Sequence, residues 1–274
     1  MTVERLPNED ARAAPSVPVE AAVTALAAAF KTTLKAASRR RVSPELPGGP
    51  DIPRSSWREG GQETPIVLVP GYLSAEGCWG SLVRRLRQSG YHRTSCLRYN
   101  SLRMPIPDVA ELVAEEASAA ARRSGTQGVH LIGYSLGGLA VRYAVQRLGT
   151  DADALSAITI ATPHRGAPLA YAAPGPAAKQ MRVRSPLLGG LPPIDSDGRV
   201  RWLLVGSTSD LVVPISSATA GRHVDSVSIP DCGHLNIIDT PQLADAVIGH
   251  LAYCRTQRRT PQSAQQKTPQ VLAS

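Results

Sequence analysis

Short apolar runs alternate with longer stretches of helical period along most of this chain. The apolar runs, each short enough for one strand, cover 65–71, 92–99, 128–132, 155–161, 201–207 and 223–230. Between and after them, apolar residues recur at three- and four-residue steps over 78–90, 107–125, 136–148 and from about 242 onward. Strands joined by crossovers of helical length pair in parallel and carry their helices on the faces of the sheet. The pattern therefore predicts an α/β fold, with a mostly parallel sheet of about six strands and helices on both faces.

The alternation covers 65–253, which we expect to be one domain, and segments of different character flank it. Residues 1–64 form an N-terminal extension, in which apolar positions predict one amphipathic helix between 20 and 38, followed by a Pro/Gly-rich linker. We expect this helix to pack on the main domain; the alternative is peripheral contact with a membrane through residues 20–41, which end in three arginines. Residues 254–274 hold four basic and no acidic groups, which predicts a disordered basic tail.

The composition fits a single globular domain better than a nucleic-acid-binding or disulfide-rich protein. The 274 residues carry a net charge of +8, and half of this excess comes from the C-terminal tail, so a solvated end accounts for it. No nucleic-acid-binding motif accompanies the charge. The four cysteines have neither zinc-site spacing nor the density of a disulfide scaffold, and we expect free thiols.

The N-terminal sequence bears on where the protein resides. It lacks the basic start followed by an apolar stretch that a secretory signal needs. The longest nearly apolar stretch, 21–30, ends at Lys31 and is too short for a bilayer-spanning helix, which needs about 20 residues. We therefore expect a cytoplasmic protein, with peripheral membrane association or a non-standard export route as the alternatives.

One serine stands where a predicted strand gives way to a predicted helix. The sequence Gly133-Tyr134-Ser135-Leu136-Gly137 follows an apolar run and opens a stretch of helical period. A G-x-S-x-G pattern often occurs by chance, but this strand-turn-helix setting is the one in which a serine hydroxyl projects above a sheet as a nucleophile. The flanking glycines remove side chains that would collide with neighbouring backbone. Ser135 is therefore the candidate nucleophile.

A serine nucleophile needs a base, and the base needs a carboxylate to fix its tautomer. His234 follows the last predicted strand, so its side chain can reach the carboxyl edge of the sheet; His164 also follows a strand, but its neighbours indicate a structural turn. Asp210 lies in the loop after the fifth predicted strand, at the same edge. Asp225 falls within a predicted strand, and Asp231 is too close to His234 along the chain to support it from behind. The candidate base is His234 and the candidate acid is Asp210.

Acyl transfer also builds negative charge on the former carbonyl oxygen, and backbone N–H groups have to meet that charge. Leu136, directly after Ser135, can supply one N–H group. The turn after the first predicted strand can supply the other, most simply from Tyr72, where Gly71 lets the chain turn. Leu136 and Tyr72 are therefore the candidate oxyanion donors.

Five segments between residue 65 and about residue 251 carry a resemblance to a known family: VLVPGY, GYSLGGLAVRY, ATPHRGAP, SDLVVPISSA and CGHLNII. In this order they resemble an α/β-hydrolase, in detail the bacterial lipase and esterase branch, although Pro70 stands where those lipases usually carry a histidine. The resemblance implies that 167–200 forms a lid or cap, which is short here, with one small helix expected over AAKQMRVRSPLLGGL. Its apolar residues would line an acyl pocket or pack in the core: Met181, Val183, Leu187, Leu188 and Leu191.

The resemblance and the candidate triad together imply a serine carboxylester hydrolase of lipase or esterase type that works through an acyl-enzyme. The implied substrate is a small-molecule acyl ester or a lipid, with no nucleic-acid partner and with neither a metal nor an organic cofactor. Two alternatives remain: an acyltransferase that uses the same triad, and a non-catalytic binding protein on this fold. The acyl chain length, the alcohol partner and the oligomeric state stay open.

Overall fold

The computed structural model describes residues 63–74, 76–195 and 199–259. The amphipathic helix expected between 20 and 38, nearly all of the linker and the end of the basic tail lie outside these described residues. Within the described part, no helix is both long and apolar enough to cross a bilayer.

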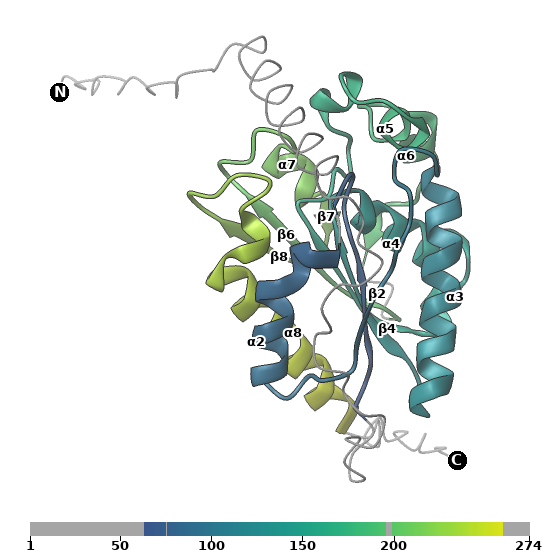
Figure 1. The fold of residues 1–274 in the computed structure, drawn as a ribbon, viewed down its shortest axis with the longest axis vertical. Helices are drawn as coiled ribbons and strands as arrows, with labels where there is room; N and C mark the ends of the chain where they lie inside the picture. The colour runs from purple at the N-terminus through teal and green to yellow at the C-terminus, as the bar shows by residue number, and fades with distance from the viewer. Residues whose placement is uncertain (1–62, 75, 196–198, 260–274) are drawn as a thin grey trace, which may run out of the picture. The chain divides into compact units, whose positions relative to one another are not determined.

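The predicted sheet is confirmed: six parallel strands lie in the order β2-β1-β3-β4-β6-β8. Their bounds are β1 Ile66–Val69, β2 Thr94–Cys96, β3 Val129–Tyr134, β4 Ala154–Ile160, β6 Arg201–Ser207 and β8 Asp225–Ile229. Because all six strands run the same way, the loops that follow them leave the sheet at one edge, which we call the carboxyl edge (Figure 1).

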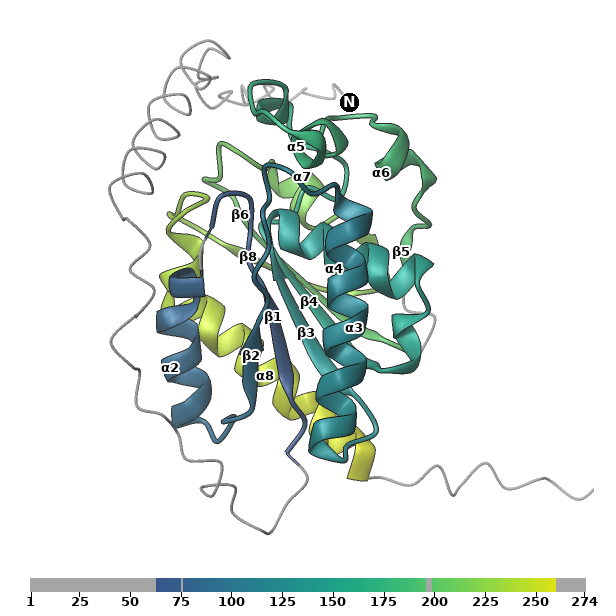
Figure 2. The same ribbon diagram turned by 45° about the vertical axis from the view of Figure 1, so that its right-hand side comes forward.

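Two pairs of long helices cover the two faces of the sheet (Figures 1 and 2). One pair is α2 Gly80–Gln88 with α8 Pro241–Arg259, and the other is α3 Ile106–Ser124 with α4 Leu136–Arg147. Successive side chains of a strand point to opposite faces, so each strand feeds two cores. Ile66 and Leu68 pack with α2 and α8, whereas Val67 and Val69 pack with α3 and α4. The near-continuous apolar run of the first strand follows from this double burial.

The last helix extends further than the sequence pattern indicated. We expected the domain to end at Tyr253, and in the structure the last helix, α8, continues through Arg259. Leu251 and Cys254 are three positions apart and both buried, which keeps the helix on the domain beyond Tyr253. No glycine or proline follows before Pro261, so nothing in the basic stretch itself ends the helix.

Residues 167–194, which we call the cap, lie over the carboxyl edge between β4 and β6 (Figure 2). The single helix expected there is wrong: two short helices form instead, α5 Pro176–Gln180 and α6 Pro186–Gly190. Pro186 has no N–H group with which to continue a helix, and Arg184 before it adopts a left-handed φ of 60°. The chain therefore breaks and restarts at Ser185, whose hydroxyl accepts the N–H of Leu188 at 3.3 Å.

Shorter elements complete the connections. A two-stranded parallel sheet, which the sequence pattern did not indicate, pairs β5 Ile194–Asp195 with β7 Gly221–Arg222. The helix α7 Ile215–Ala218 lies beside the cap at the carboxyl edge (Figure 1). Short 3₁₀ helices occupy other loops: η2 Glu76–Trp79, η3 Thr150–Ala152, η4 Pro168–Tyr171 and η5 Ile237–Asp239.

Polar side chains of α4 tie down the far end of the cap. The buried Arg142 guanidinium donates to the carbonyl of Pro192 at 2.6 Å and to that of His164 at 3.1 Å. Gln146, one turn further along α4, donates to the carbonyl of Pro193 at 3.0 Å. Burial lowers the pKa of Arg142 to about 10, which still leaves the side chain charged at neutral pH. The cap is thereby joined to the helix that starts directly after Ser135.

Candidate active site

Ser135 occupies the turn between β3 and α4, as the sequence predicted. Its φ of 53° and ψ of −116° lie in a region that side chains other than glycine rarely adopt, so the turn is strained. Its N–H donates to the carbonyl of Ile160 at 2.8 Å, which fixes the turn on the neighbouring strand. A Cβ added to Gly133 would lie 2.5 Å from the Cα of Gly138, so these glycines allow α4 to start directly over the strand.

Two loops at the carboxyl edge bring His234 and Asp210 to this serine. The Nε2 atom of His234 lies 3.1 Å from the hydroxyl oxygen of Ser135, and its Nδ1 atom lies 2.7 Å from Oδ2 of Asp210. The other carboxylate oxygen, Oδ1, accepts the N–H groups of Val212 at 2.8 Å and Val213 at 2.9 Å. Since the fully buried carboxylate is fixed through both oxygens, it can hold the imidazole in one orientation. The three residues chosen from the sequence thus form one hydrogen-bonded chain.

His164, the other histidine weighed from the sequence, lies in the structural turn expected of it. Its N–H donates to the carbonyl of Thr162 at 2.9 Å, and its Nε2 atom lies 2.9 Å from the hydroxyl oxygen of Thr159. Burial, and next the charge of Arg142, lower the pKa of His164 well below its ordinary value. A histidine kept neutral in this way supports the loop after β4 and is a poor base for Ser135.

Tyr134 is a residue of this site that sequence reasoning missed. Its hydroxyl donates to the carbonyl of His234 at 2.8 Å, and the two ring centroids lie 5.4 Å apart at a tilt of 31°. Trp79 also packs against the tyrosine ring, in an edge-on arrangement with 6.5 Å between the ring centroids. Burial raises the pKa of Tyr134, so its hydroxyl keeps the proton that it donates. The sequence did offer one signal for Tyr134: it is the last residue of β3 and directly precedes Ser135.

The loop after β1, from which Tyr72 comes, lies directly against the nucleophile turn. A Cβ added to Gly71 would lie 3.2 Å from the Cβ of Ser135, so only a glycine fits there without displacing its neighbours. The N–H group of Leu73 donates to the hydroxyl of Ser101 at 2.9 Å. Since it already has this partner, the Leu73 N–H group is a poorer candidate for an oxyanion donor beside Ser135 than that of Tyr72. Leu136 begins α4 next to Ser135. Tyr72 and Leu136 therefore remain the predicted oxyanion donors, on backbone that borders the serine.

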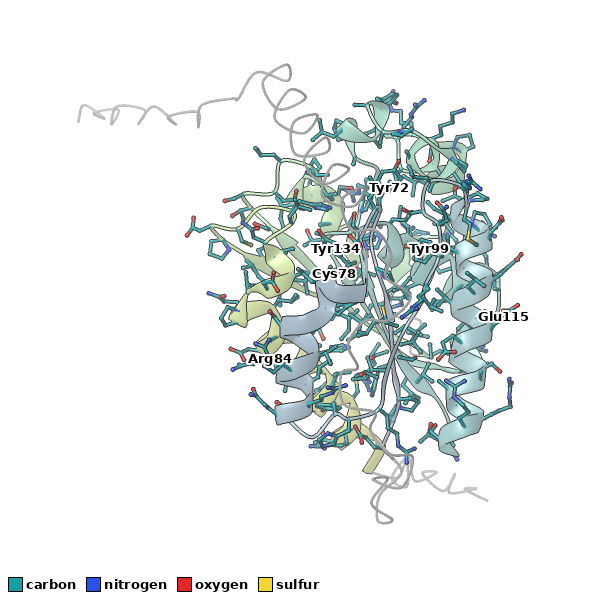
Figure 3. All side chains as sticks on the ribbon, viewed as in Figure 1. Tyr72, Cys78, Arg84, Tyr99, Glu115 and Tyr134 are labelled. Carbon is teal, nitrogen blue, oxygen red and sulfur yellow. The ribbon has the colours of Figure 1, made fainter. Side chains whose placement is uncertain are left out.

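Side chains from two other segments brace this loop. The Tyr99 hydroxyl donates to the carbonyl of Pro70, and the Tyr72 hydroxyl donates to the carbonyl of Pro174 in the cap. Figure 3 shows Tyr72 nearer the cap than Tyr134. Burial raises the pKa of Tyr72 to about 12, so its hydroxyl stays a donor at neutral pH. The loop that carries Pro70 and Tyr72 is thus held by two tyrosine hydroxyls.

The apolar residues of the cap divide between core and surface. Met181 and Leu188 are buried in a cluster with Leu136 and Leu139, which follow Ser135 on α4. Leu191 is also buried, Leu187 is partly buried against the same cluster, and Val183 is exposed. Core packing is therefore the role of at least three of the five residues named from the sequence: Met181, Leu188 and Leu191. Among the described residues, no group of three or more His, Cys, Asp or Glu side chains is placed to hold a metal ion.

Comparison with known proteins agrees with this architecture. Residues 66–185 match the family model of palmitoyl protein thioesterases, a stretch that includes Ser135 and ends before Asp210. Among solved structures, the chain is similar to the mature lipase BlEst2 of Bacillus licheniformis, with a TM-score of 0.59 and 15% identity over 71% of this chain and 94% of that one.

Two further structures are similar over the same share of this chain. For lipase B of Aspergillus fumigatus the TM-score is 0.57 at 18% identity, covering 71% of this chain and 55% of that one. For phospholipase PlaB of Legionella pneumophila it is 0.55 at 13% identity, covering 71% and 62%. Among curated proteins, none matches this sequence significantly. The likenesses confirm the expected class: the chain has the α/β-hydrolase fold.

Proposed function

We propose that this chain is a serine hydrolase that cleaves acyl esters through a covalent acyl-enzyme. The observation that carries the proposal is the continuous hydrogen-bonded chain from Ser135 through His234 to Asp210, with distances of 3.1 and 2.7 Å. A hydroxyl at neutral pH is a weak nucleophile, and this arrangement supplies the base and the group that orients the base. The resemblance to lipases and to palmitoyl protein thioesterases supports the same class of chemistry.

In the proposed reaction, the Ser135 oxygen attacks the ester carbonyl carbon while its proton passes to Nε2 of His234. The Asp210 carboxylate stabilises the imidazolium, and the N–H groups of Tyr72 and Leu136 meet the oxyanion. The C–O bond to the leaving group then breaks, and His234 returns the proton to the departing alkoxide. Water attacks the acyl-serine in the second half, with the proton again passing through His234, and releases the acid and the free serine.

Thioesters are the second candidate substrate class, because the family model that matches residues 66–185 describes palmitoyl protein thioesterases. The triad performs the same acylation on a thioester, with a thiolate as the leaving group. A thiolate is a weaker base than an alkoxide and depends less on the proton from His234. The ratio of thioester to ester hydrolysis therefore separates the two specificities.

The test uses p-nitrophenyl esters from acetate to palmitate, together with an alkyl ester and an alkyl thioester of one acid. Ser135→Ala should lower turnover roughly 10⁴- to 10⁶-fold, whereas Ser81→Ala on α2 should leave it unchanged. A peak at short acyl chains would indicate an esterase with a shallow site, and a peak at long chains a lipase-like acyl channel. Retained activity in the Ser135→Ala variant would overturn the proposal.

Two outcomes would favour a function other than ester hydrolysis. If added alcohols or amines receive the acyl group faster than water does, the chain is an acyltransferase. If Ser135 fails to react with a serine-directed fluorophosphonate and no ester is hydrolysed, the chain is a binding protein on a hydrolase fold.

A further inference from the structure

Exposed apolar side chains occur on several segments at the carboxyl edge, where the candidate site lies. Among the described residues, six large apolar or aromatic side chains are exposed: Leu148, Tyr171, Val183, Leu211, Leu235 and Tyr253. Four of these, Tyr171, Val183, Leu211 and Leu235, come from segments that follow β4, β6 and β8 at the carboxyl edge. We call these four the apolar rim. Exposed side chains scattered singly need no explanation, but several at one edge of a domain favour an interaction surface.

Two members of the apolar rim are direct neighbours of triad residues. Leu211 follows Asp210 and is 61% exposed, and Leu235 follows His234 and is 58% exposed. The hydrogen bond between Asp210 and His234 joins their loops, so both leucines lie on backbone directly beside the candidate triad.

The same edge carries an excess of positive charge. Arg165, Lys179, Arg182 and Arg184 lie on the loop after β4 and on the cap, and no aspartate or glutamate occurs between residues 161 and 194. Arg165, Lys179 and Arg184 are exposed, and we call these three the rim cations. Arg165 is fixed beside α7, because its N–H donates to the Ser217 hydroxyl at 3.0 Å. Charge and apolar surface therefore occur together at this edge.

Contacts with neighbouring residues fix the backbone at the tip of the cap, residues 182–184, where Val183 and Arg184 are exposed. The Arg182 guanidinium lies over the ring of Tyr171, 5.0 Å from its centroid, and the Tyr171 hydroxyl donates to the carbonyl of Val183 at 3.2 Å. Gly166 packs so closely beneath that an added Cβ would lie 2.6 Å from the Cα of Val183. The left-handed φ of 60° at Arg184 is an unfavourable conformation that these contacts maintain. Val183 and Arg184 are thus exposed on a segment whose backbone is fixed by these contacts.

We propose that the apolar rim and the rim cations dock the protein on an anionic lipid surface, with the carboxyl edge and its candidate site facing the membrane. Leucine, valine and tyrosine side chains bind at the boundary between headgroups and acyl chains, and arginine and lysine are attracted by anionic headgroups. The charge favours an anionic surface over a neutral one, and the absence of acidic groups in the cap removes the repulsion that would oppose it. The proposal rests on the proposed function for one point, that acyl substrate enters past the rim.

The experiment measures sedimentation of the full chain with vesicles of phosphatidylcholine alone and of phosphatidylcholine mixed with phosphatidylglycerol. It uses the Ser135→Ala protein, so that binding is measured without turnover of lipid. We expect tighter binding to the mixed vesicles, and a loss of about fivefold for each rim cation removed, as in Arg184→Gln and Arg165→Gln. Arg84→Gln, on the exposed surface of α2 (Figure 3), is the matched control for charge elsewhere on the chain and should have no effect of this size.

The apolar part of the surface has its own pair of variants. Leu211→Ser should weaken binding to both kinds of vesicle by roughly tenfold, because it removes apolar area that would leave water. Leu148→Ser, at the end of α4 and away from the carboxyl edge, should leave binding unchanged. If Arg184→Gln and Arg84→Gln weaken binding equally, or if neither rim variant weakens it, the proposal is overturned.

A different result would reassign the cations. If Arg184→Gln raised KM for a soluble acyl substrate with an anionic leaving group and left vesicle binding unchanged, the cations would serve that substrate and the docking proposal would be wrong. Hydrolysis of p-nitrophenyl acetate by the Arg184→Gln enzyme should equal that of the unmodified enzyme. Loss of vesicle binding would leave the hydrolase proposal standing, and absence of ester hydrolysis would leave the docking proposal standing.

Discussion

Among the described residues, two serine–histidine pairs are hydrogen-bonded, and they differ in burial, in backbone setting and in the group behind the histidine. His130 on β3 and Ser156 on β4 face each other across the sheet, with Nδ1 and the hydroxyl oxygen 2.7 Å apart. Ser135 and His234 are joined at 3.1 Å, but both lie in loops, and Asp210 stands behind the histidine. Ser156 is fully buried within β4, whereas Ser135 lies in a strained turn at the carboxyl edge. If Ser135 and His234 are catalytic as proposed, their place in the fold and the third residue distinguish them from a serine–histidine contact that is only structural.

The largest effect should come from removing that third member. Asp210→Asn keeps the size of the side chain but favours the wrong imidazole tautomer, so kcat should fall roughly 10⁴-fold in ester hydrolysis. Asp231→Asn, an exposed carboxylate three positions before His234, is the matched control and should leave kcat unchanged. A fall of less than tenfold for Asp210→Asn would mean that His234 is oriented by other groups.

The comparison extends to histidines that folding keeps neutral. Burial lowers the pKa of His164 well below its ordinary value of 6.5 and also lowers that of His250. The unfolded chain takes up protons on these groups below about pH 6.5, while the folded chain does not, so the unfolded state binds more protons. The free energy of unfolding should therefore fall with pH below about 6.5, by up to about 1.4 kcal/mol per unit for each histidine, until the pH reaches the lowered pKa.

Urea unfolding at a series of pH values between about 7.5 and 5 measures this slope. His164→Gln removes one of the two groups and should reduce the slope, whatever it does to stability at neutral pH. An unchanged slope in that variant would show that His164 does not titrate with folding.

A change at Tyr134 tests how far the Ser135–His234 pair depends on the hydrogen bond that Tyr134 donates to His234. Tyr134→Phe leaves the carbonyl of His234 without its buried donor, a change worth about 1–3 kcal/mol in other proteins. We expect kcat to fall about tenfold with KM unchanged, because the position of the base is affected and not the binding of substrate. Tyr91→Phe, which removes another buried hydroxyl from the same core, is the control. Equal losses of thermal stability with no change in kcat would make Tyr134 a packing residue.

The smallest expected effect on ester hydrolysis comes from changing the buried pair, His130 and Ser156. Ser156→Ala removes the partner of His130 Nδ1 and should lower the free energy of unfolding by about 1–2 kcal/mol. Ester hydrolysis by the folded variant should not change. A loss of activity larger than the loss of folded protein would contradict a purely structural role for this pair.

Much of the site could be predicted from the sequence because parallel strands end at one edge. Once Ser135 was placed at a strand end, the residues Asp210 and His234 after later strands were bound to lie near it. The apolar runs located the sheet for the same reason, since strands buried on both faces contain few polar residues. The extended α8 was missed because basic residues were interpreted as tail, although Cys254 continues the buried face.

The missed features depend on contacts between distant segments. The pairing of β5 with β7 involves two residues from each strand and leaves no periodic pattern. The hydrogen bonds that brace the loop after β1 join it to Tyr99, Ser101 and the cap, which only the folded chain brings together. The two helices of the cap were foreseeable in part, because Pro186 interrupts the stretch that we expected to be one helix.

The hydrogen bond from Arg142 to the end of the cap bears on the kinetics expected of the enzyme. The same guanidinium binds the end of the cap and the loop after β4, and it belongs to the helix that begins beside the nucleophile. We expect a cap held at its end in this way to stay with the serine, so that no hinged opening precedes each turnover. Contact with a lipid surface should then raise activity in proportion to the enzyme bound, through the local concentration of substrate. Progress curves on long-chain esters should start without a lag, and the rate should follow adsorption smoothly as vesicles are added.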